Sequence, residues 1–421
     1  MDIDSICEQL RAGAKTLALH SALKKNHALR CVSESIFANK TRILQANARD
    51  VTKARERGMT EALVERLSLD EKKFNSILEG ISVIEKQSDP IGSEVCGWTL
   101  PNGIHIAQTR VPLGVAAIIY ESRPNVTVDA FALAYKSGNA ILLRGSSSAL
   151  ESNTALFEAI QEGLCKAGDD GVQNAVYLCK STDHSDVEQI LNAVGKIDVA
   201  LPRGGASLIK MVVEKAKIPV IQTGSGVCHL YVDSDADVKM ACDIAQNAKM
   251  QRPGACNAIE TILVHKDIAS SFIPELSCAF KGGVDILADE NTFNLLQKTE
   301  YPKQKIAHST PEDYGFEFLD LKIALKTVDS FEEAVEFINA HNTKHSDCIV
   351  TNNRARARQF QSQIDAACVY VNASTRFTDG GEFGFGAELG ISTQKLHARG
   401  PMGISALTTT KFVIDGDGQI R

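Results

Sequence analysis

Over the first 90 residues, apolar positions recur roughly every 3.6 residues, and charged side chains occupy most of the positions between them. This period predicts amphipathic helices, because side chains three and four residues apart share one helix face. Gly58 interrupts the pattern within the stretch 46–69, so we expect one helix before it and a second, short helix after it. The first 90 residues are therefore predicted to be helical.

Near residue 94 the pattern changes to an alternation of apolar and polar positions. Two alternating segments flank the turn sequence Pro101-Asn102-Gly103, and together they predict a β-hairpin over about 94–112. Another alternating segment, 406–415, lies close to the C-terminus. It could add an edge strand to this hairpin or to a neighbouring subunit.

From Val115 onward, short apolar runs alternate with helical stretches. The first series consists of VAAIIY, AILLR, AVYLC, IDVAL and IPVIQ, which begin at residues 115, 140, 175, 197 and 218. A second series begins with CHLYVD at 228–233 and continues through AIETILVH, VDILA, CIVT and ACVYV. Strands that alternate with helices predict parallel sheets covered on both faces. The expected fold class is therefore α/β, with two doubly wound domains and a hairpin.

These patterns divide the chain into three parts. Residues 1–227 are expected to form a nucleotide-binding domain that the hairpin interrupts, and residues 228–375 a second domain. Residues 376–421 form a tail that is rich in glycine at first and ends in the alternating segment.

Composition narrows the classes of function. The net charge of −7 and the pI near 5.9 disfavour binding to a phosphate backbone, so no nucleic-acid partner is expected. The basic stretch with Arg354, Arg356 and Arg358 is expected to be a solvated helix face. No apolar run approaches the ~20 residues that span a bilayer, and no secretory signal is recognised at the N-terminus. The sequence therefore predicts a soluble protein without a membrane partner.

The eleven cysteines are scattered, and none forms a CxxC pair. Their odd number, without a secretion signal, predicts reduced thiols and a cytoplasmic location. His105, His229 and His308 lack acidic or cysteine partners at metal-ligand spacing, so they are interpreted as structural. No metal is expected.

The first candidate for cofactor binding follows the run AILLR. No GxGxxG motif follows a strand, which disfavours the commonest dinucleotide-binding mode. Instead Arg144, Gly145, Ser146, Ser147 and Ser148 precede a helix expected near Ser152, and free backbone N–H groups there would suit a phosphate. A serine-rich helix cap beside a surface arginine remains the alternative.

Two glycine-containing segments end predicted strands, where open α/β sheets bind ligands. They contain Gly204 and Gly205 in the first segment and Gln222, Thr223 and Gly224 in the second. Glycine there allows a ligand to approach the backbone, although tight turns would explain the same residues.

Cys256 lies in the loop 251–257, among glycine, proline and small residues. Such a thiol is open to approach, but most cysteines in a chain like this are small buried apolar residues. Asn257 and the backbone N–H groups of the loop could hold a developing oxyanion. Cationic and polar residues that would suit an anionic substrate occur at Arg203, Ser374, Thr375, Arg376, Lys395 and His397, and a solvated charged loop is the alternative.

Several longer segments together resemble the γ-glutamyl phosphate reductase family of the aldehyde dehydrogenase superfamily. They are VPLGV (111–115), ESRPNVTVD (121–129), KSGNAILLRG (136–145), PRGGA (202–206), CHLYVD (228–233), VYVNASTRFTDGG (369–381) and STQKLHARGPMG (392–403). The resemblance runs nearly end to end. It implies an aldehyde-dehydrogenase-like fold and the NADPH-dependent reduction of L-glutamyl 5-phosphate to glutamate 5-semialdehyde and phosphate, in proline biosynthesis.

The resemblance also implies roles for residues. Cys256 is the expected nucleophile, which forms a thioester as phosphate leaves. Asn125 is the expected oxyanion-hole asparagine, acting with the backbone N–H of Cys256. Arg144 and the serines after it are expected to hold the adenosine ribose and, through their charge and hydroxyls, a 2′-phosphate. Gln222 stands where oxidising members carry a glutamate base, which fits a reductase that must not hydrolyse its thioester.

The remaining implications concern partners. The hairpin and tail join subunits in the superfamily, so a homodimer or homotetramer is expected. The unstable acyl phosphate suggests hand-over from the upstream glutamate kinase. An aldehyde dehydrogenase that oxidises and hydrolyses, and a scaffold without activity, are the alternatives.

Overall fold

A computed structural model describes residues 2–168, 171–181 and 183–421. These residues form two compact units, each described here by itself. Unit 1 comprises Met1–Thr223, Gly384–Gly390 and Pro401–Arg421, and unit 2 comprises Gly224–Phe383 and Ile391–Gly400. The C-terminal tail is thus divided between both units.

The N-terminal part of unit 1 is helical, as predicted. It consists of α1 (Ile3–Leu17), α2 (Ala22–Ala38), α3 (Lys40–Glu56), α4 (Glu61–Leu67) and α5 (Glu71–Lys86). The predicted break at Gly58 is confirmed, because this residue has a φ of 74° and separates α3 from α4. Oxygens of Asp2, Ser21 and Asp70 accept backbone N–H groups at the starts of α1, α2 and α5, so polar caps define where these helices begin.

A parallel sheet in the order β5-β4-β3-β6 forms the centre of unit 1. Its strands are β3 (Val115–Tyr120), β4 (Ala140–Arg144), β5 (Val176–Leu178) and β6 (Val199–Arg203). The connecting helices are α6 (Asn125–Lys136), α7 (Leu150–Lys166), α8 (His184–Leu191) and α9 (Ala206–Lys215), with 3₁₀ turns at Ser147–Ala149 and Val172–Ala175. The chain winds outward from β3 in both directions, which confirms the doubly wound prediction.

The run IPVIQ was predicted to be a strand, and this prediction is wrong. Only Val220 forms a bridge, to Ala200 in β6. Pro219 has no N–H to donate, so the ladder cannot extend from this bridge toward the start of the run.

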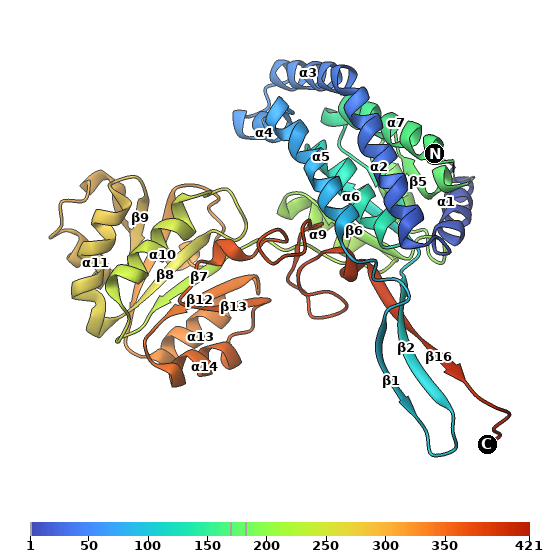
Figure 1. Ribbon diagram of the computed structural model, residues 1–421. Helices are drawn as coiled ribbons and strands as arrows, with labels where there is room; N and C mark the ends of the chain where they lie inside the picture. The colour runs from blue at the N-terminus through green and yellow to red at the C-terminus, as the bar shows by residue number, and fades with distance from the viewer. Residues whose placement is uncertain (1, 169–170, 182) are drawn as a thin grey trace. The chain divides into compact units, whose positions relative to one another are not determined.

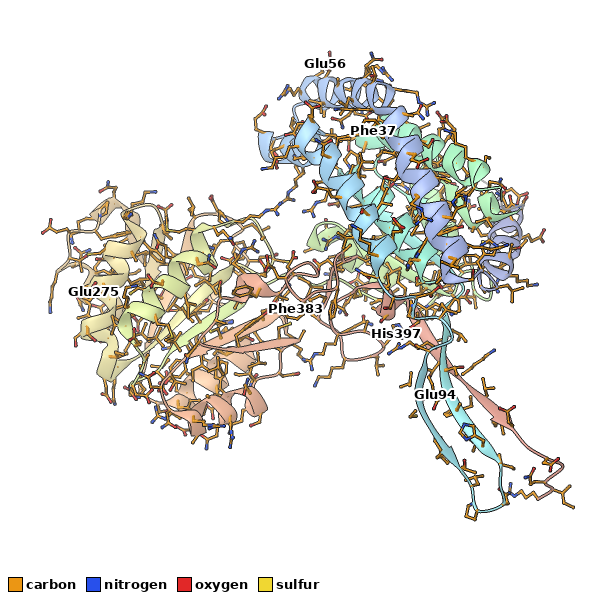
Figure 2. All side chains as sticks on the ribbon, in the orientation of Figure 1. Phe37, Glu56, Glu94, Glu275, Phe383 and His397 are labelled. Carbon is orange, nitrogen blue, oxygen red and sulfur yellow. The ribbon has the colours of Figure 1, made fainter. Side chains whose placement is uncertain are left out.

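The predicted hairpin is confirmed as part of a three-stranded antiparallel sheet, which we call the arm. It consists of β1 (Glu94–Thr99), β2 (His105–Pro112) and β16 (Thr408–Asp415), in the order β1-β2-β16. The alternating C-terminal segment therefore does pair with the hairpin, over eight residues of β2. Within unit 1 the arm extends away from the helices (Figure 1), and its side chains stand out on both sides of the ribbon, from Glu94 onward (Figure 2).

Unit 2 is built on a seven-stranded parallel sheet in the order β10-β9-β11-β8-β7-β12-β13. The strands are β7 (Cys228–Val232), β8 (Ile259–His265), β9 (Asp285–Ala288), β10 (Ile306–His308), β11 (Lys322–Val328), β12 (Ser346–Val350) and β13 (Cys368–Val371). The helices are α10 (Val238–Met250), α11 (Lys266–Phe280), α12 (Glu290–Leu296), α13 (Phe331–His341) and α14 (Arg354–Gln363). Short elements of unit 2 are 3₁₀ turns at Lys303–Lys305, Pro311–Asp313 and Thr375–Phe377 and the two-residue strand β14 (Ile391–Ser392), whereas the 3₁₀ turn Ile404–Leu407 belongs to unit 1. The two-residue strand β15 (Gly400–Pro401) stands at the boundary of the two ranges.

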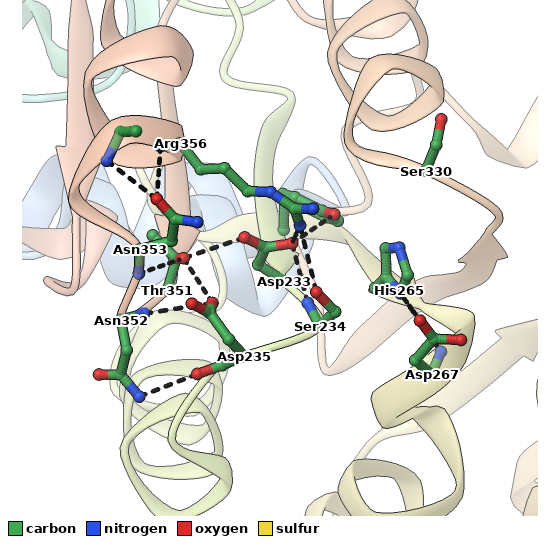
Figure 3. A network of polar contacts seen from close by, with 12 residues as sticks. Asp233, Ser234, Asp235, His265, Asp267, Ser330, Thr351, Asn352, Asn353 and Arg356 are labelled. Atoms are coloured by element: carbon green, nitrogen blue, oxygen red, sulfur yellow. Dashed lines mark hydrogen bonds and ion pairs between the residues drawn. The ribbon is translucent and has the colours of Figure 1, made fainter.

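The winding of the unit 2 sheet reverses between β7 and β12. At the carboxyl ends of these two strands, side chains of the protein form a network of hydrogen bonds with one another (Figure 3). The fully buried Asp233 accepts the hydroxyl hydrogens of Tyr231 at 3.0 Å and Thr351 at 2.9 Å, and it pairs with the Arg356 guanidinium. Arg356 therefore ties a helix to the sheet, whereas Arg354 and Arg358 are exposed, as expected for a solvated face. This edge of unit 2 is filled by the protein itself.

Candidate active site

The loop that carries Cys256 connects α10 to β8, at the amino end of the unit 2 sheet. Two tight turns shape it, since Ala255 N–H donates to Arg252 O at 3.1 Å and Ala258 N–H donates to Ala255 O at 3.0 Å. The Cys256 side chain is partly exposed, whereas Cys228 on the neighbouring strand is fully buried. Cys256 is thus placed where a small molecule can reach its thiol.

Gly226 and Cys228, at the entry to β7, contact the backbone of this loop. The Cys228 thiol donates to the Cys256 carbonyl at 3.3 Å, and burial raises the pKa of Cys228 well above its usual range. Gly226 approaches the same carbonyl so closely that a β-carbon there would overlap it. The Gly226 N–H donates a hydrogen bond to Glu317 Oε1 at 2.7 Å. The position of the Cys256 backbone therefore depends on this contact with Gly226.

The segment Ser374–Thr378 fastens the loop from its other side. The Arg376 guanidinium bridges residues on both sides of Cys256, since Nε donates to Gln251 Oε1 at 3.0 Å and Nη1 donates to Asn257 Oδ1. Burial, and then the nearby charge of Arg252, lower the pKa of Arg376, whereas Cys256 opposes that change. The predicted substrate residue Arg376 thus lies at the Cys256 loop and brings a positive charge to it.

The residues before Arg376 form hydrogen bonds with backbone groups. Thr375 is fully buried and its hydroxyl donates to Asn257 O at 2.7 Å, while Ser374 Oγ accepts the Arg376 N–H at 3.2 Å. The Asn257 amide donates to Thr378 O at 2.9 Å and to Arg376 O at 3.3 Å. The expectation that the Asn257 side chain could hold an oxyanion is therefore wrong, because its amide hydrogens are engaged within the protein.

A buried ion pair joins the two ends of the loop. Lys249 at the end of α10 pairs with Glu260 in β8, and both side chains are fully buried. Burial raises the pKa of the Glu260 carboxyl and lowers that of the Lys249 ammonium, and each charge opposes the shift of the other. Glu260 also accepts the Leu319 N–H at 3.2 Å. Losing one partner of such a pair leaves an uncompensated charge and costs ~3–5 kcal/mol, so the pair fixes the loop firmly.

Lys395 and His397 are exposed residues of the segment 391–400 of unit 2. The carboxylate of Asp365 pairs with Lys395 at 3.1 Å, Arg399 at 2.6 Å and Lys344 at 3.1 Å. The hydrogen bond from Arg399, supported by the two lysines, holds the pKa of Asp365 well below its usual range. His397 is exposed and has a left-handed backbone, with a φ of 65°. Within unit 2, Gly224 packs against Thr393 in the same segment.

In unit 1, the loops after β3 and β6 meet where the winding of the sheet reverses, which is where open α/β sheets bind ligands. Glu121 N–H donates to Arg203 O at 3.0 Å, and Gly205 N–H donates to the Glu121 carboxylate at 2.8 Å. Gly204 lies against the same carboxylate, and Thr223 donates to Pro202 O at 3.0 Å. The predicted residues Arg203, Gly204, Gly205 and Thr223 are therefore gathered at this edge.

Arg144 and the serines lie at the end of β4. Arg144 is buried, and its terminal nitrogens donate to the carbonyls of Gly145 at 3.2 Å and Asp183 at 3.3 Å. Its Nε has no hydrogen-bond partner within the described ranges. The hydroxyls of Ser122, Ser146 and Ser148 form a cluster, with Ser148 2.8 Å from Ser122 and 2.7 Å from Ser146. The buried Arg144 Nε lacks an acceptor, and the serine hydroxyls follow it in the same loop. Together these groups fit a ribose or phosphate oxygen.

The helix after these serines begins differently from the prediction. The N–H groups of Glu151 and Ser152 donate to the Asp50 carboxylate of α3 at 3.4 and 2.8 Å, so they are not free for a phosphate. The expectation of free N–H groups at this helix start is therefore wrong. The Asp50 carboxylate thus takes the position at the start of α7 that an anionic ligand would otherwise occupy.

Asn125 is the first residue of α6, directly after the loop that follows β3, and it is exposed. Its amide donates to the carboxylate of Asp129 at 2.9 Å. Sequence reasoning missed Asp129 and Glu121, although both lie in the motif ESRPNVTVD. The i, i+4 spacing of Asn125 and Asp129 was the available signal, since such pairs meet on one helix face.

Two classes of site find no support in the described part of the chain. No group of three or more His, Cys, Asp or Glu side chains there is arranged to hold a metal ion. None of the helices formed by these residues is both long and apolar enough to cross a bilayer.

The chain is similar to known proteins over nearly its whole length. A family model described as "Aldehyde dehydrogenase family" matches residues 1–284 and 323–413. The gamma-glutamyl phosphate reductase of Treponema pallidum subsp. pallidum is 51% identical over 98% of both chains, and that of Moorella thermoacetica is 49% identical over 100% of this chain and 99% of the relative. The crystal structure of gamma-glutamyl phosphate reductase from Thermotoga maritima is 43% identical over 100% of both chains, with a TM-score of 0.95.

Proposed function

We propose that this chain reduces L-glutamyl 5-phosphate to glutamate 5-semialdehyde and phosphate, using NADPH, in proline biosynthesis. The proposal starts from its family, because the chain belongs to the aldehyde dehydrogenase family and, within it, to the γ-glutamyl phosphate reductases. The observation that carries this proposal is the partly exposed thiol of Cys256, on a loop that the Arg376 guanidinium spans. A nucleophile beside a fixed cation suits a substrate whose reacting carbonyl carries a phosphate.

In the proposed reaction, the Cys256 thiolate attacks the C5 carbonyl of the substrate. The tetrahedral adduct collapses with expulsion of phosphate and leaves a thioester on Cys256. Reduction converts the thioester to a thiohemiacetal, whose collapse releases the aldehyde and returns the thiolate. Asn125 donates an N–H to the carbonyl oxygen as negative charge develops on it.

A nicotinamide cofactor supplies the hydride for this reduction. In unit 1, the buried Arg144 Nε and the serine hydroxyls would hold its adenosine ribose, and the edge with Gly204, Gly205 and Thr223 would line the rest of its site. A guanidinium with neutral hydroxyls suits the 2′-phosphate of NADPH better than a carboxylate would, which supports the choice of NADPH.

For the substrate, we propose contacts with Arg203, Ser374, Thr375, Arg376, Lys395 and His397, the cationic members of which would meet its carboxylate and phosphate. Gln222 is an amide, which cannot take a proton from water as the glutamate base of oxidising enzymes does. A thioester on Cys256 is thereby protected from hydrolysis.

The reverse reaction tests this proposal. Purified protein is incubated with glutamate 5-semialdehyde and NADP⁺, with and without phosphate, and NADPH is followed by its absorbance. The proposal predicts NADPH formation that requires phosphate. Equal rates in both samples would indicate hydrolysis and an oxidising aldehyde dehydrogenase instead.

We also infer that a second copy of this chain covers the arm. Trp98, Phe412 and Ile414 on the arm are 44%, 58% and 59% exposed, and the rings of the first two meet edge to face. Apolar side chains gathered on a sheet without a second layer mark an interface. The double change Trp98→Glu and Phe412→Glu is expected to yield particles of 45.5 kDa in light scattering, whereas the parent chain forms a homodimer or homotetramer.

Leu23 serves as the matched control, because it is 80% exposed and belongs to α2, not to a strand of the arm. Leu23→Glu is expected to leave the mass unchanged. A double variant with the same mass as the parent would rule out the arm as the interface.

We place the protein in the cytoplasm, because all eleven cysteines are free thiols. We further propose that the upstream glutamate kinase hands over the acyl phosphate directly, since this anhydride decays in water. Co-purification of the two proteins would support such a transfer.

A further inference from the structure

Asn125 and Asp129 form a pair of side chains on the first turn of α6. The residues are four apart, so their side chains lie on one face of the helix. The Asn125 Nδ2 donates to the Asp129 Oδ2 at 2.9 Å. Asn125 is exposed, whereas Asp129 is partly buried behind it.

This contact fixes which end of the Asn125 amide faces outward. An amide presents either its carbonyl oxygen or its NH₂ group, and the two orientations have almost the same shape. An ionised carboxylate only accepts hydrogen bonds, so it selects the orientation in which Nδ2 faces Asp129. One hydrogen of the NH₂ group is then bound, and the second remains for another acceptor.

We infer that Asp129 is a positioning residue, which holds the Asn125 amide so that it offers an N–H, not a carbonyl oxygen, to the reacting carbonyl. This inference rests on the proposed function, in which Asn125 stabilises the oxyanion. Asp129 itself touches neither the substrate nor the reacting atoms in this role.

The Asp129 carboxyl accepts the Asn125 N–H on α6 and is acted on by the charge of Arg203 at the end of β6. From α5, Gly80 packs beside it, since a β-carbon at Gly80 would lie 3.8 Å from Asp129 Oδ1. Burial raises the pKa of Asp129 to about 6, against the opposing effects of the Asn125 hydrogen bond and the Arg203 charge. Below this pH the neutral acid can donate a hydrogen bond to the Asn125 carbonyl, which favours the reversed amide. Activity should therefore fall as the pH drops through about 6.

Kinetics of the reverse reaction test the inference. Asn125→Ala is expected to lower kcat by about 10²–10³-fold, as the loss of one oxyanion donor does. Asp129→Ala is expected to lower kcat by about 10-fold or more, with KM for the semialdehyde within about twofold, because only the orientation of the donor is lost. In the Asn125→Ala background, Asp129→Ala should change kcat by less than about twofold.

Asp129→Asn is the isosteric variant, whose amide does not titrate and can donate as well as accept a hydrogen bond, so it no longer selects one orientation of the Asn125 amide. It should lose part of the kcat, as Asp129→Ala does, and should lack the decline near pH 6. Equal losses from Asp129→Ala in both backgrounds, or a decline near pH 6 that persists in Asp129→Asn, would show a merely structural role and overturn the inference.

Side-chain NMR separates this inference from the proposed function. The Asn125 NH₂ signals should shift with a midpoint near pH 6 in the parent protein and stay constant in Asp129→Asn. Signals that are constant from pH 5 to 8 in the parent would overturn the inference, even in an active enzyme. A shift without any turnover would support the pairing of the two residues and refute the proposed reaction alone.

Discussion

Replacement of Cys256 by serine is expected to abolish the reaction, with a loss on the order of 10⁴-fold or more in kcat. A serine hydroxyl is almost fully protonated at neutral pH, and without a neighbouring base it is a poor nucleophile. NADPH formation from glutamate 5-semialdehyde, NADP⁺ and phosphate measures the effect. The binding of NADP⁺, measured by calorimetry, should be unchanged, because the proposed cofactor residues lie in unit 1.

The control for this variant is Cys278→Ser. Cys278 is exposed on α11, whereas the Cys256 thiol is only partly exposed. Its replacement should leave kcat within about twofold, because exposed substitutions away from a site have small effects. Activity that survives in Cys256→Ser would exclude Cys256 as the nucleophile, and activity lost in Cys278→Ser would point to a different thiol.

Replacement of Gly226 by alanine is expected to have the second-largest effect. The new methyl group would overlap the Cys256 carbonyl, so the loop must move. A displacement of about 1 Å at a reacting group costs about 10²-fold in rate, and forced overpacking costs ~1–3 kcal/mol of stability. Steady-state kinetics and urea unfolding measure the two losses.

Gly254→Ala is the matched control, because Gly254 lies in the same loop as Cys256. A methyl group there would meet the Leu319 carbonyl oxygen at 3.7 Å, an ordinary contact. This variant should keep most of its activity and stability. If both variants behave alike, the contact between Gly226 and the Cys256 carbonyl does not set the position of the loop.

The fold could be predicted wherever a strand is a continuous apolar run. In β3 and β8, every residue is buried and apolar residues predominate, so pattern alone located them. Strand β11 was missed because Lys322 and Lys326 interrupt its apolar residues. Both lysines extend over aromatic rings, of Phe318 and Phe337, so their stems pack while the strand stays in the sheet.

The site was less predictable than the fold. Local spacing could not separate Cys256 from the ten other cysteines, and the resemblance to a known family made that distinction. The carboxylates Asp50, Glu121 and Asp365 were missed, because each acts on a partner that is distant in the sequence. Only the folded chain shows that Asp50 occupies a helix start and that Asp365 holds the charge of Lys395.

The two sheets differ in which edge lies beside the candidate site residues. The rule that ligands bind at the carboxyl edge of an open sheet predicts the cluster in unit 1, where the loops after β3 and β6 meet. In unit 2 that edge is filled by Asp233 and its partners, and Cys256 lies at the amino edge. Sequence pattern locates strand ends, but it does not say which end remains open.

In the proposed reaction, Cys256 forms a thioester that phosphate, and not water, releases. The most direct test of this step is rapid mixing of the protein with glutamate 5-semialdehyde and NADP⁺ in the absence of phosphate. We expect a burst of NADPH equal to one molecule per Cys256, followed by almost no further formation until phosphate is added. Continued steady formation of NADPH without phosphate would contradict this mechanism.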